Sequence, residues 1–281
     1  MARYLPMSLI RLSLVGCGNI ASEICEAVRD GRIRAEITGL TDMEPGRAER
    51  LREQFQLNHA VVGDLETVAG AADLLVEAAS VSAVAPVLET AIRMGMDCLI
   101  MSLGGLIFRT DLMEQAQKAG VRVWLPSGAV CGLDGIRAAK EAGLDSVTLT
   151  TRKPPRGLAG APWVVEHGID LGALTEATVI FEGNALDAVR AFPANVNVAA
   201  ALSLAGIGPE KTRVRVIADP AATENSHEIE AKGPFGELRA VTRNRPSPNN
   251  PKTSYLASLS AIHELRRAAE LWCRPALKSS V

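Results

Sequence analysis

The histidines are the first side chains in the sequence that could move protons, because imidazole titrates near neutral pH. His227 stands in a segment that alternates apolar and polar residues, 225–237 (NSHEIEAKGPFGE). On such a strand a histidine can serve as a general acid or base, or it can be a surface or strand-pairing residue, and both interpretations stay open. His167 and His263 are expected to be structural or solvated.

No pattern of metal ligands accompanies these histidines. None of the four lies in an HExxH motif or in a Cys/His cluster, and the five cysteines are scattered without CxxC spacing. An odd number of cysteines, spread along the chain, indicates reduced thiols rather than a disulfide framework or a zinc site. We therefore expect a cytoplasmic protein that holds no metal.

A glycine motif near the N-terminus has the strand–turn–helix context of a dinucleotide-binding fingerprint. Gly16 allows a tight turn, Gly18 lets the backbone approach a pyrophosphate, and Ala21 suits close packing of helix on strand. Asn19 and Ile20 are expected in the first turn of the following helix. This helix N-terminus would present N–H groups and a positive dipole end to the phosphates.

The next apolar segment, AEITGLTD, ends in Asp42 at the spacing expected of the second strand in such a unit. A carboxylate there can accept hydrogen bonds from both adenosine ribose hydroxyls, which favours NAD. Asp42 could instead begin a turn with Glu44, while Arg47 and Arg50 leave room for the 2′-phosphate of NADP. The expected cofactor is NAD or NADP, with NAD favoured.

Short apolar segments alternate with helical ones as far as residue 131, which is typical of a doubly wound parallel sheet of the Rossmann type. The loops after these strands would meet at the carboxyl edge of the sheet, where such folds bind ligands. Small residues in the loops, Ala79, Ser80 and Ala129, suit the close passage of a nicotinamide riboside, although each is also an ordinary turn residue. Residues 1–131 are thus predicted to be a dinucleotide-binding domain.

The second half of the chain has a different character. Residues 145–155 and 177–192 are strand-like, and residues 212–244 alternate apolar and polar side chains. We predict a second α/β domain, 132–253, with a mainly antiparallel open sheet, one face of which helices or another subunit must cover. A homodimer is the expected assembly, and a C-terminal helix in 254–281 is expected to pack on the first domain.

Composition excludes several classes of partner. The 281 residues carry a net charge of −2 with both signs interspersed, and only 4% are aromatic, so neither a nucleic-acid face nor a base-stacking platform is predicted. The apolar N-terminal run is too short for a bilayer and Arg11 interrupts it, which indicates neither a signal peptide nor a membrane partner. A small-molecule substrate is the expected partner.

An alanine-rich stretch, 192–206 (FPANVNVAAALSLAG), is predicted to be a buried helix with Asn195 and Asn197 at its start. Buried amides are costly unless they are hydrogen-bonded. Asn195 could be a helix N-cap, or it could hold an amide toward a ligand.

Seven segments in order resemble one family, the L-aspartate dehydrogenases, which use NAD(P). The segments are GCGNIA (16–21), VEAAS (76–80), LPSGAVCGLDGI (125–136), TRKPP (151–155), FEGNALDAVRAFPANVNVAAALSLAG (181–206), NSHEIEAKGPFGE (225–237) and PSPNNPKTS (246–254).

The resemblance implies a Rossmann domain followed by an α/β domain whose open sheet builds a dimer. It implies that His227 is catalytic and that Ala129 and Asn195 contact the nicotinamide nucleotide. The implied reaction is oxidation of L-aspartate to iminosuccinate, which water converts to oxaloacetate and ammonia, and the imine could supply NAD biosynthesis.

Binding of a dicarboxylate substrate requires cationic side chains or hydroxyl donors. The candidates are Arg152, Lys153, Lys252 and Thr253. Each can also be read as a surface residue in a turn. Two alternatives remain: another two-domain NAD(P) oxidoreductase of the sugar-dehydrogenase type, and a nucleotide-sensing protein without catalysis. The absence of a lysine in the loop MSLGG counts against a sugar substrate.

Overall fold

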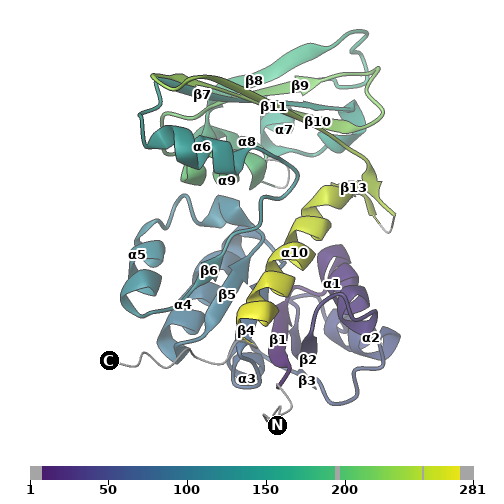
Figure 1. Cartoon of the computed structure of the whole chain (residues 1–281). Helices are drawn as coiled ribbons and strands as arrows, with labels where there is room; N and C mark the ends of the chain where they lie inside the picture. The colour runs from purple at the N-terminus through teal and green to yellow at the C-terminus, as the bar shows by residue number, and fades with distance from the viewer. Residues whose placement is uncertain (1–7, 194–196, 249, 273–281) are drawn as a thin grey trace. The chain divides into compact units, whose positions relative to one another are not determined.

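The structure is a computed structural model that describes residues 8–193, 197–248 and 250–272, and for residues 250–253 the backbone alone (Figure 1). The chain forms two compact units. Of the described chain, the first unit takes the residues up to 101, then 111–126 and those from 261 onward, and the second takes 102–110 and 127–260. The domain limits expected from the sequence, at 131 and 253, stay predictions.

The first unit is built on a six-stranded sheet in the order β3-β2-β1-β4-β5-β6, and every neighbouring pair is parallel. Its strands are β1 (Ile10–Val15), β2 (Ala35–Thr41), β3 (Val61–Val62), β4 (Leu74–Glu77), β5 (Asp97–Ile100) and β6 (Val123–Trp124). The connecting helices are α1 (Asn19–Arg29), α2 (Arg47–Gln54), α3 (Leu65–Ala69), a short 3₁₀ turn η1 (Val81–Ala83), α4 (Val84–Met94) and α5 (Asp111–Lys118). This confirms the Rossmann-type prediction.

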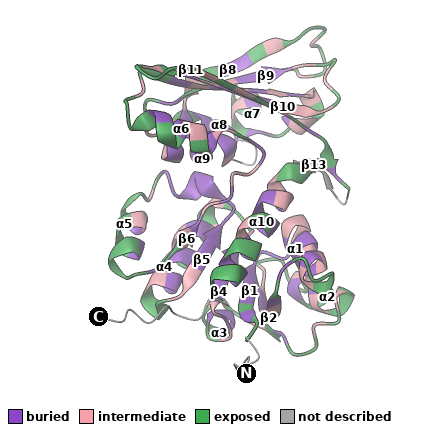
Figure 2. Ribbon diagram, viewed as in Figure 1, coloured by how far each residue is buried: buried purple, intermediate pink, exposed green. Residues whose placement is uncertain are grey.

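The centre of this sheet is buried on both faces, as parallel strands between two helical layers must be. Leu12, Leu14 and Leu75 are at most 1% exposed, and Figure 2 shows β1, β4 and β5 as buried strands. The crossover helices leave the carboxyl ends of the strands open as loops. Those loops carry most of the predicted cofactor contacts.

The second unit is built on a five-stranded sheet in the order β11-β10-β7-β9-β8. Its strands are β7 (Ser146–Lys153), β8 (Thr178–Asn184), β9 (Arg213–Ala218), β10 (Asn225–Gly233) and β11 (Gly236–Asn244), with a small separate ribbon of β12 (Pro246–Ser247) and β13 (Asn250–Ser254). Its helical segments are η2 (Leu103–Gly105), α6 (Leu133–Lys140), η3 (Pro155–Gly157), α7 (Pro162–Glu166), α8 (Ala185–Ala191) and α9 (Asn197–Ala205). Only β7 and β9 pair in parallel, so the sheet is mixed but mainly antiparallel, as predicted.

The strand-like prediction for residues 177–192 is wrong in its second half. The strand ends at Asn184, whose side-chain oxygen accepts a hydrogen bond from the N–H of Asp187 at 2.9 Å and so caps α8. A side-chain acceptor at this position and the alanines that follow favour a helix. Helices α6, α8 and α9 lie along one face of the sheet (Figure 1).

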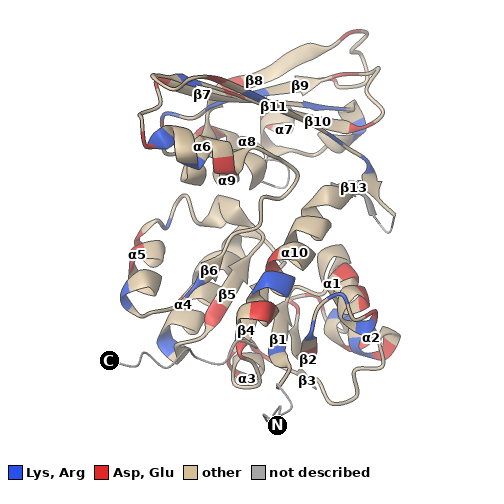
Figure 3. Cartoon of the chain, viewed as in Figure 1, with Lys and Arg blue, Asp and Glu red and all other residues tan. Residues whose placement is uncertain are grey.

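The opposite face of this sheet is open and polar within the described chain. Its charged side chains pair across strands, with Arg215 and Glu182 3.2 Å apart and Arg239 bonded to Glu228. Val179 and Val241 are each 49% exposed. Acidic and basic residues are interspersed over both units rather than gathered (Figure 3).

A last helix, α10 (Tyr255–Trp272), follows the ribbon. From Ala261 it belongs to the first unit, where the guanidinium of Arg267 lies 5.9 Å from the ring centroid of Trp124. Among the helices that the structure describes, none combines the length and the apolar character that crossing a membrane would require.

Candidate active site

The glycine loop after β1 has the shape that a dinucleotide requires. Gly16 adopts φ +93°, and a Cβ there would lie 2.6 Å from the Cα of Ala79, so only glycine fits. A Cβ on Gly18 would meet nothing within 4 Å, so the space beside its Cα is open. Gly18 is also the N-cap of α1, where Asn19 and Ile20 begin the helix. An open loop at a helix N-terminus fits a pyrophosphate.

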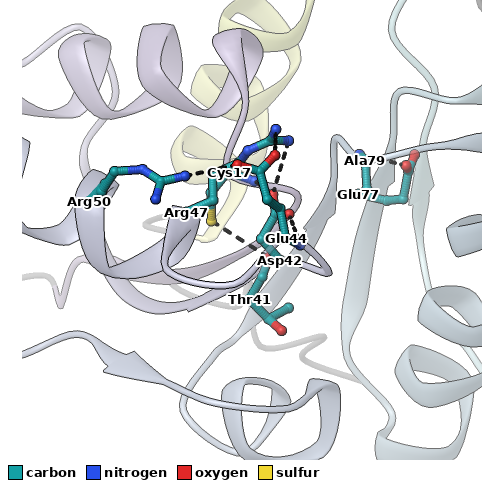
Figure 4. Close-up of polar contacts among 8 residues, drawn as sticks. All are labelled: Cys17, Thr41, Asp42, Glu44, Arg47, Arg50, Glu77 and Ala79. Carbon is teal, nitrogen blue, oxygen red and sulfur yellow. Dashed lines mark hydrogen bonds and ion pairs between the residues drawn. The ribbon is translucent and has the colours of Figure 1, made fainter.

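Asp42 follows β2 and holds the loop in place (Figure 4). Its carboxylate accepts hydrogen bonds from the N–H of Cys17 at 2.7 Å and from the N–H of Glu44 at 2.8 Å, and its side chain is 8% exposed. The two interpretations of Asp42 are therefore compatible: it shapes the turn, and each carboxylate oxygen keeps a lone pair that a ribose hydroxyl could use.

Glu77, the last residue of β4, is a site residue that sequence reasoning missed. It is fully buried, and one carboxylate oxygen accepts the N–H groups of Ala79 at 2.9 Å and Ser80 at 3.0 Å. The other oxygen accepts the N–H of Met101 at 3.2 Å. One buried side chain therefore fixes the loops after β4 and β5, and the signal for it was an acidic residue in the otherwise apolar run LLVE.

Ala129, a predicted nicotinamide contact, is held by two side chains of β11. Its carbonyl oxygen accepts hydrogen bonds from Thr242 Oγ1 at 2.8 Å and from Asn244 Nδ2 at 2.9 Å. The N–H of Gly128 donates to Ser260 Oγ at 3.0 Å. Because both lone pairs of the Ala129 carbonyl are engaged, its N–H is the backbone group of this residue that a ligand could use.

The structure describes one of the two asparagines that the sequence predicts at the start of the alanine-rich helix. Asn195 lies outside the described residues. Asn197 is the first residue of α9, and its side-chain oxygen accepts the N–H of Gly104 at 3.3 Å. Asn197 therefore supports the η2 loop.

His227 lies on the helix-covered face of the sheet, opposite Thr151 in the pairing of β10 with β7. The Nδ1 atom of His227 is 3.1 Å from Thr151 Oγ1. The exposed fractions are 3% for His227, 1% for Thr151 and 6% for Lys153, two residues further along β7 on the same face. A buried imidazole, hydroxyl and amine therefore share one small region.

Burial changes the ionisation of this group. Loss of solvent lowers the pKa of Lys153 to about 8, and it lowers the pKa of His227 to about 3, with the positive charge of Lys153 as a second cause. At neutral pH His227 is therefore uncharged, while Lys153 is still mainly a cation.

The neighbouring cation, Arg152, points the other way. Successive residues of a strand face opposite sides of the sheet, and Arg152 donates to Asp219 at 2.8 Å on the open face. This hydrogen bond holds the pKa of Asp219 below its usual value. The structure therefore brings Lys153, and not Arg152, to His227.

Lys153 lines a hollow of about 190 Å³ in the second unit. Arg156, Thr223, Glu224 and Asn225 line it too. The hollow is thus lined by two cationic side chains, one carboxylate (Glu224) and two neutral polar side chains, and the excess of positive charge suits a carboxylate ligand. Arg156 is not among the residues predicted from the sequence. The side chains of Lys252 and Thr253 lie outside the described residues.

Two of the other three histidines, His167 and His59, make contacts elsewhere in the chain. The ring of His167 stacks on Trp163 with centroids 3.6 Å apart, and His59 Nε2 lies 3.1 Å from a carboxylate oxygen of Glu36. Neither contact resembles the buried environment of His227.

Family models match both units. Residues 16–126 match the model described as homoserine dehydrogenase, NAD binding domain, and residues 134–268 match aspartate dehydrogenase, C-terminal. Together with the parallel sheet and the open glycine loop, these matches define an NAD(P)-dependent oxidoreductase.

Relatives of nearly full length narrow this class. An L-aspartate dehydrogenase of Methanosarcina mazei is 47% identical over 92% of this chain and 97% of its own length. One from Bradyrhizobium diazoefficiens is 36% identical over 95% of this chain and 94% of its own length. The chain belongs to the aspartate dehydrogenase family.

Solved structures agree with this assignment. The crystal structure of aspartate dehydrogenase from Thermotoga maritima matches with a TM-score of 0.68 and 25% identity over 98% of this chain and 99% of that one. A myo-inositol dehydrogenase from Lactobacillus casei matches with a TM-score of 0.56 over 94% of this chain and 86% of that one, at only 12% identity. The second likeness concerns the fold alone.

Proposed function

We propose that this chain oxidises L-aspartate to iminosuccinate, which water converts to oxaloacetate and ammonia, and transfers the hydride to NAD or NADP. The identity with curated L-aspartate dehydrogenases over more than nine-tenths of the chain is the observation that carries the proposal. The buried His227 and the cationic hollow beside it supply chemistry suited to an amino dicarboxylate.

The cofactor would be held by the open glycine loop and the loops fixed around it. Gly16, Gly18, Asn19 and Ile20 would contact the pyrophosphate, and Asp42 would accept the ribose hydroxyls, which favours NAD. Ala79, Ser80, Ala129 and Asn195 remain the proposed contacts nearer the nicotinamide. When bound, the nicotinamide supplies the acceptor for the hydride that leaves the substrate Cα.

His227 would accept the proton that the substrate amine must lose before a C=N bond can form. For Nε2 to be the acceptor, Nδ1 must carry the hydrogen and donate it to Thr151 Oγ1, so Thr151 would set the tautomer. Loss of one proton to His227 and of one hydride to the nicotinamide would balance the oxidation of the C–N bond to C=N. In the hydrolysis that follows, water would supply the carbonyl oxygen, and the substrate nitrogen would leave as ammonia and take the proton back from His227. Lys153 and Arg156 would bind a substrate carboxylate through charge-assisted hydrogen bonds.

A spectrophotometric assay tests the function directly. NADH or NADPH absorbs at about 340 nm, so aspartate with NAD(P) should give a rising signal, and oxaloacetate with ammonia and NADH a falling one. Malate, myo-inositol and other amino acids are the matched controls. Reduction with myo-inositol but not aspartate would favour the sugar-dehydrogenase alternative, and no turnover in either direction would favour the nucleotide sensor.

The ionisation of Lys153 predicts a pH dependence. Its lowered pKa of about 8 means that the cation is present below this pH and is lost above it. Succinate has no amine and keeps both carboxylates ionised over this range, so its inhibition constant against aspartate should be constant near neutral pH and rise above pH 8. A flat profile up to about pH 9.5 would contradict the assignment; a Lys153→Met variant should be flat throughout.

The assembly is a further part of the proposal. The open face of the second sheet, with paired charges and two half-exposed valines, would pair two copies as a homodimer. Sedimentation velocity of the full chain measures this, and a single species of 29.7 kDa would contradict it.

A further inference from the structure

One carboxylate, that of Glu224, lines the hollow beside Lys153. Glu224 is half-buried, and within the part of the chain that the structure describes its side chain forms no hydrogen bond or ion pair. Arg156, in the same hollow, is exposed and likewise forms no ion pair with a described residue. Opposite charges therefore line one hollow without pairing to each other, which leaves both available to a ligand.

The loop that carries Glu224, residues 219–224, connects β9 to β10 and is fixed beside β7. The N–H of Asp219 donates to the carbonyl oxygen of Lys153 at 2.9 Å. The carboxylate of Asp219 accepts the backbone N–H two residues further on, also at 2.9 Å, and so shapes the turn. The loop then enters β10, the strand that carries His227. Glu224 is therefore placed by the backbone at the hollow that Lys153 lines.

The amine of the proposed substrate is the group that the cations of this hollow cannot recognise. Aspartate, succinate, malate and oxaloacetate all carry two carboxylates at neutral pH, so Lys153 and Arg156 would attract each of them. Only aspartate also carries an ammonium group, whose N–H donors pair with a carboxylate through charge-assisted hydrogen bonds. Of the described residues that line the hollow, Glu224 alone supplies a carboxylate. Its negative charge also repels a ligand that has carboxylates and no amine.

On the basis of the proposed function, we infer that the carboxylate of Glu224 binds the α-ammonium group of the substrate and thereby selects amino dicarboxylates over dicarboxylates that have no amine. Lys153 and Arg156 supply the attraction for carboxylate, and Glu224 supplies the selection. A neighbouring carboxylate favours the charged form of an amine, so Glu224 contributes to substrate binding rather than to the proton transfer at His227.

Calorimetric titration of the full chain saturated with NADH tests the inference, with L-aspartate and succinate as the two ligands. Glu224→Gln keeps the side-chain shape and removes the charge. The Kd for aspartate should rise about tenfold because a charge-assisted hydrogen bond is lost, whereas the Kd for succinate should fall about two- to fivefold because a repulsion is lost. Glu210→Gln, which removes an exposed carboxylate near the other end of β9, is the matched control and should change neither Kd.

The opposite shifts of the two ligands separate selection from a structural role. In steady-state assays of Glu224→Gln, KM for aspartate should rise about tenfold and kcat should stay within about twofold, as expected of a group that binds substrate and transition state alike. The inference is overturned if the Kd for aspartate rises no more than it does in Glu210→Gln, or if the Kd for succinate rises equally. The titrations need no turnover, so a failure of aspartate to reduce NAD in the unmodified chain would overturn the proposed function and leave their outcome distinct.

Discussion

Replacing His227 by alanine should lower kcat for aspartate oxidation by about 10²- to 10⁴-fold, the range typical of a lost general base. The Kd for NADH should be nearly unchanged, because His227 lies on the sheet of the second unit among Thr151 and Lys153 and not in the glycine loop. Stopped-flow or steady-state rates at 340 nm and titration with NADH measure the two quantities.

Because His227 is buried, the variant needs a test for folding. A His227→Gln variant keeps a polar side chain of similar size, and added imidazole should restore part of the rate in His227→Ala if the missing group is a base. His167→Ala, which removes an exposed imidazole, is the matched control and should be fully active. Loss of NADH binding in His227→Ala would place this residue on the cofactor side and contradict the assignment.

Replacing Lys153 by methionine should raise KM for aspartate by about 10- to 100-fold, because a hydrogen bond to a charged group contributes about 1.5–3 kcal/mol. The KM for NAD should hardly change. Methionine fills a similar volume, and since it removes a buried amine it should not destabilise the fold through an unpaired charge.

The adjacent arginine provides the control for this experiment. Arg152→Met removes the same charge one residue away, but from the open face, where Arg152 pairs with Asp219. Its effect on KM for aspartate should be small. Equal effects of the two variants would mean that charge in general, and not the hollow beside His227, binds the substrate.

The elements of the first unit were predictable because their signals are local. Gly16, Gly18 and the alternation of short apolar strands with helices appear within windows of about 30 residues. The wrong strand prediction for the second half of 177–192 has a local cause as well. The segment begins with β-favouring residues, but Asn184 before an alanine-rich stretch favours a helix start.

The arrangement of the site was harder to predict. The alternation of side chains along β7 could have predicted that Lys153 is buried. Val147 and Leu149 are buried, and Lys153 lies an even number of residues from both, so it shares their face. The hydrogen bonds from Thr242 and Asn244 to the carbonyl of Ala129 join residues more than 110 positions apart. Hydrophobic periodicity describes local structure only, so it cannot predict such a contact. Burial of Lys153 and Thr151 likewise depends on helices supplied by distant segments.

Lys153 and Arg152 face opposite sides of the sheet because they are successive residues of one strand. The site therefore depends on the exact number of residues that precede Lys153 in β7. β7 is hydrogen-bonded to β10 on one side and to β9 on the other, so its register is fixed from both edges. Deleting one residue within β7 would exchange the faces of the two cations, whereas deleting two would keep lysine on the correct face but move it by about 6–7 Å. Length changes in this strand should therefore abolish activity even where the sheet survives, and the flanking loops are where the chain can tolerate them.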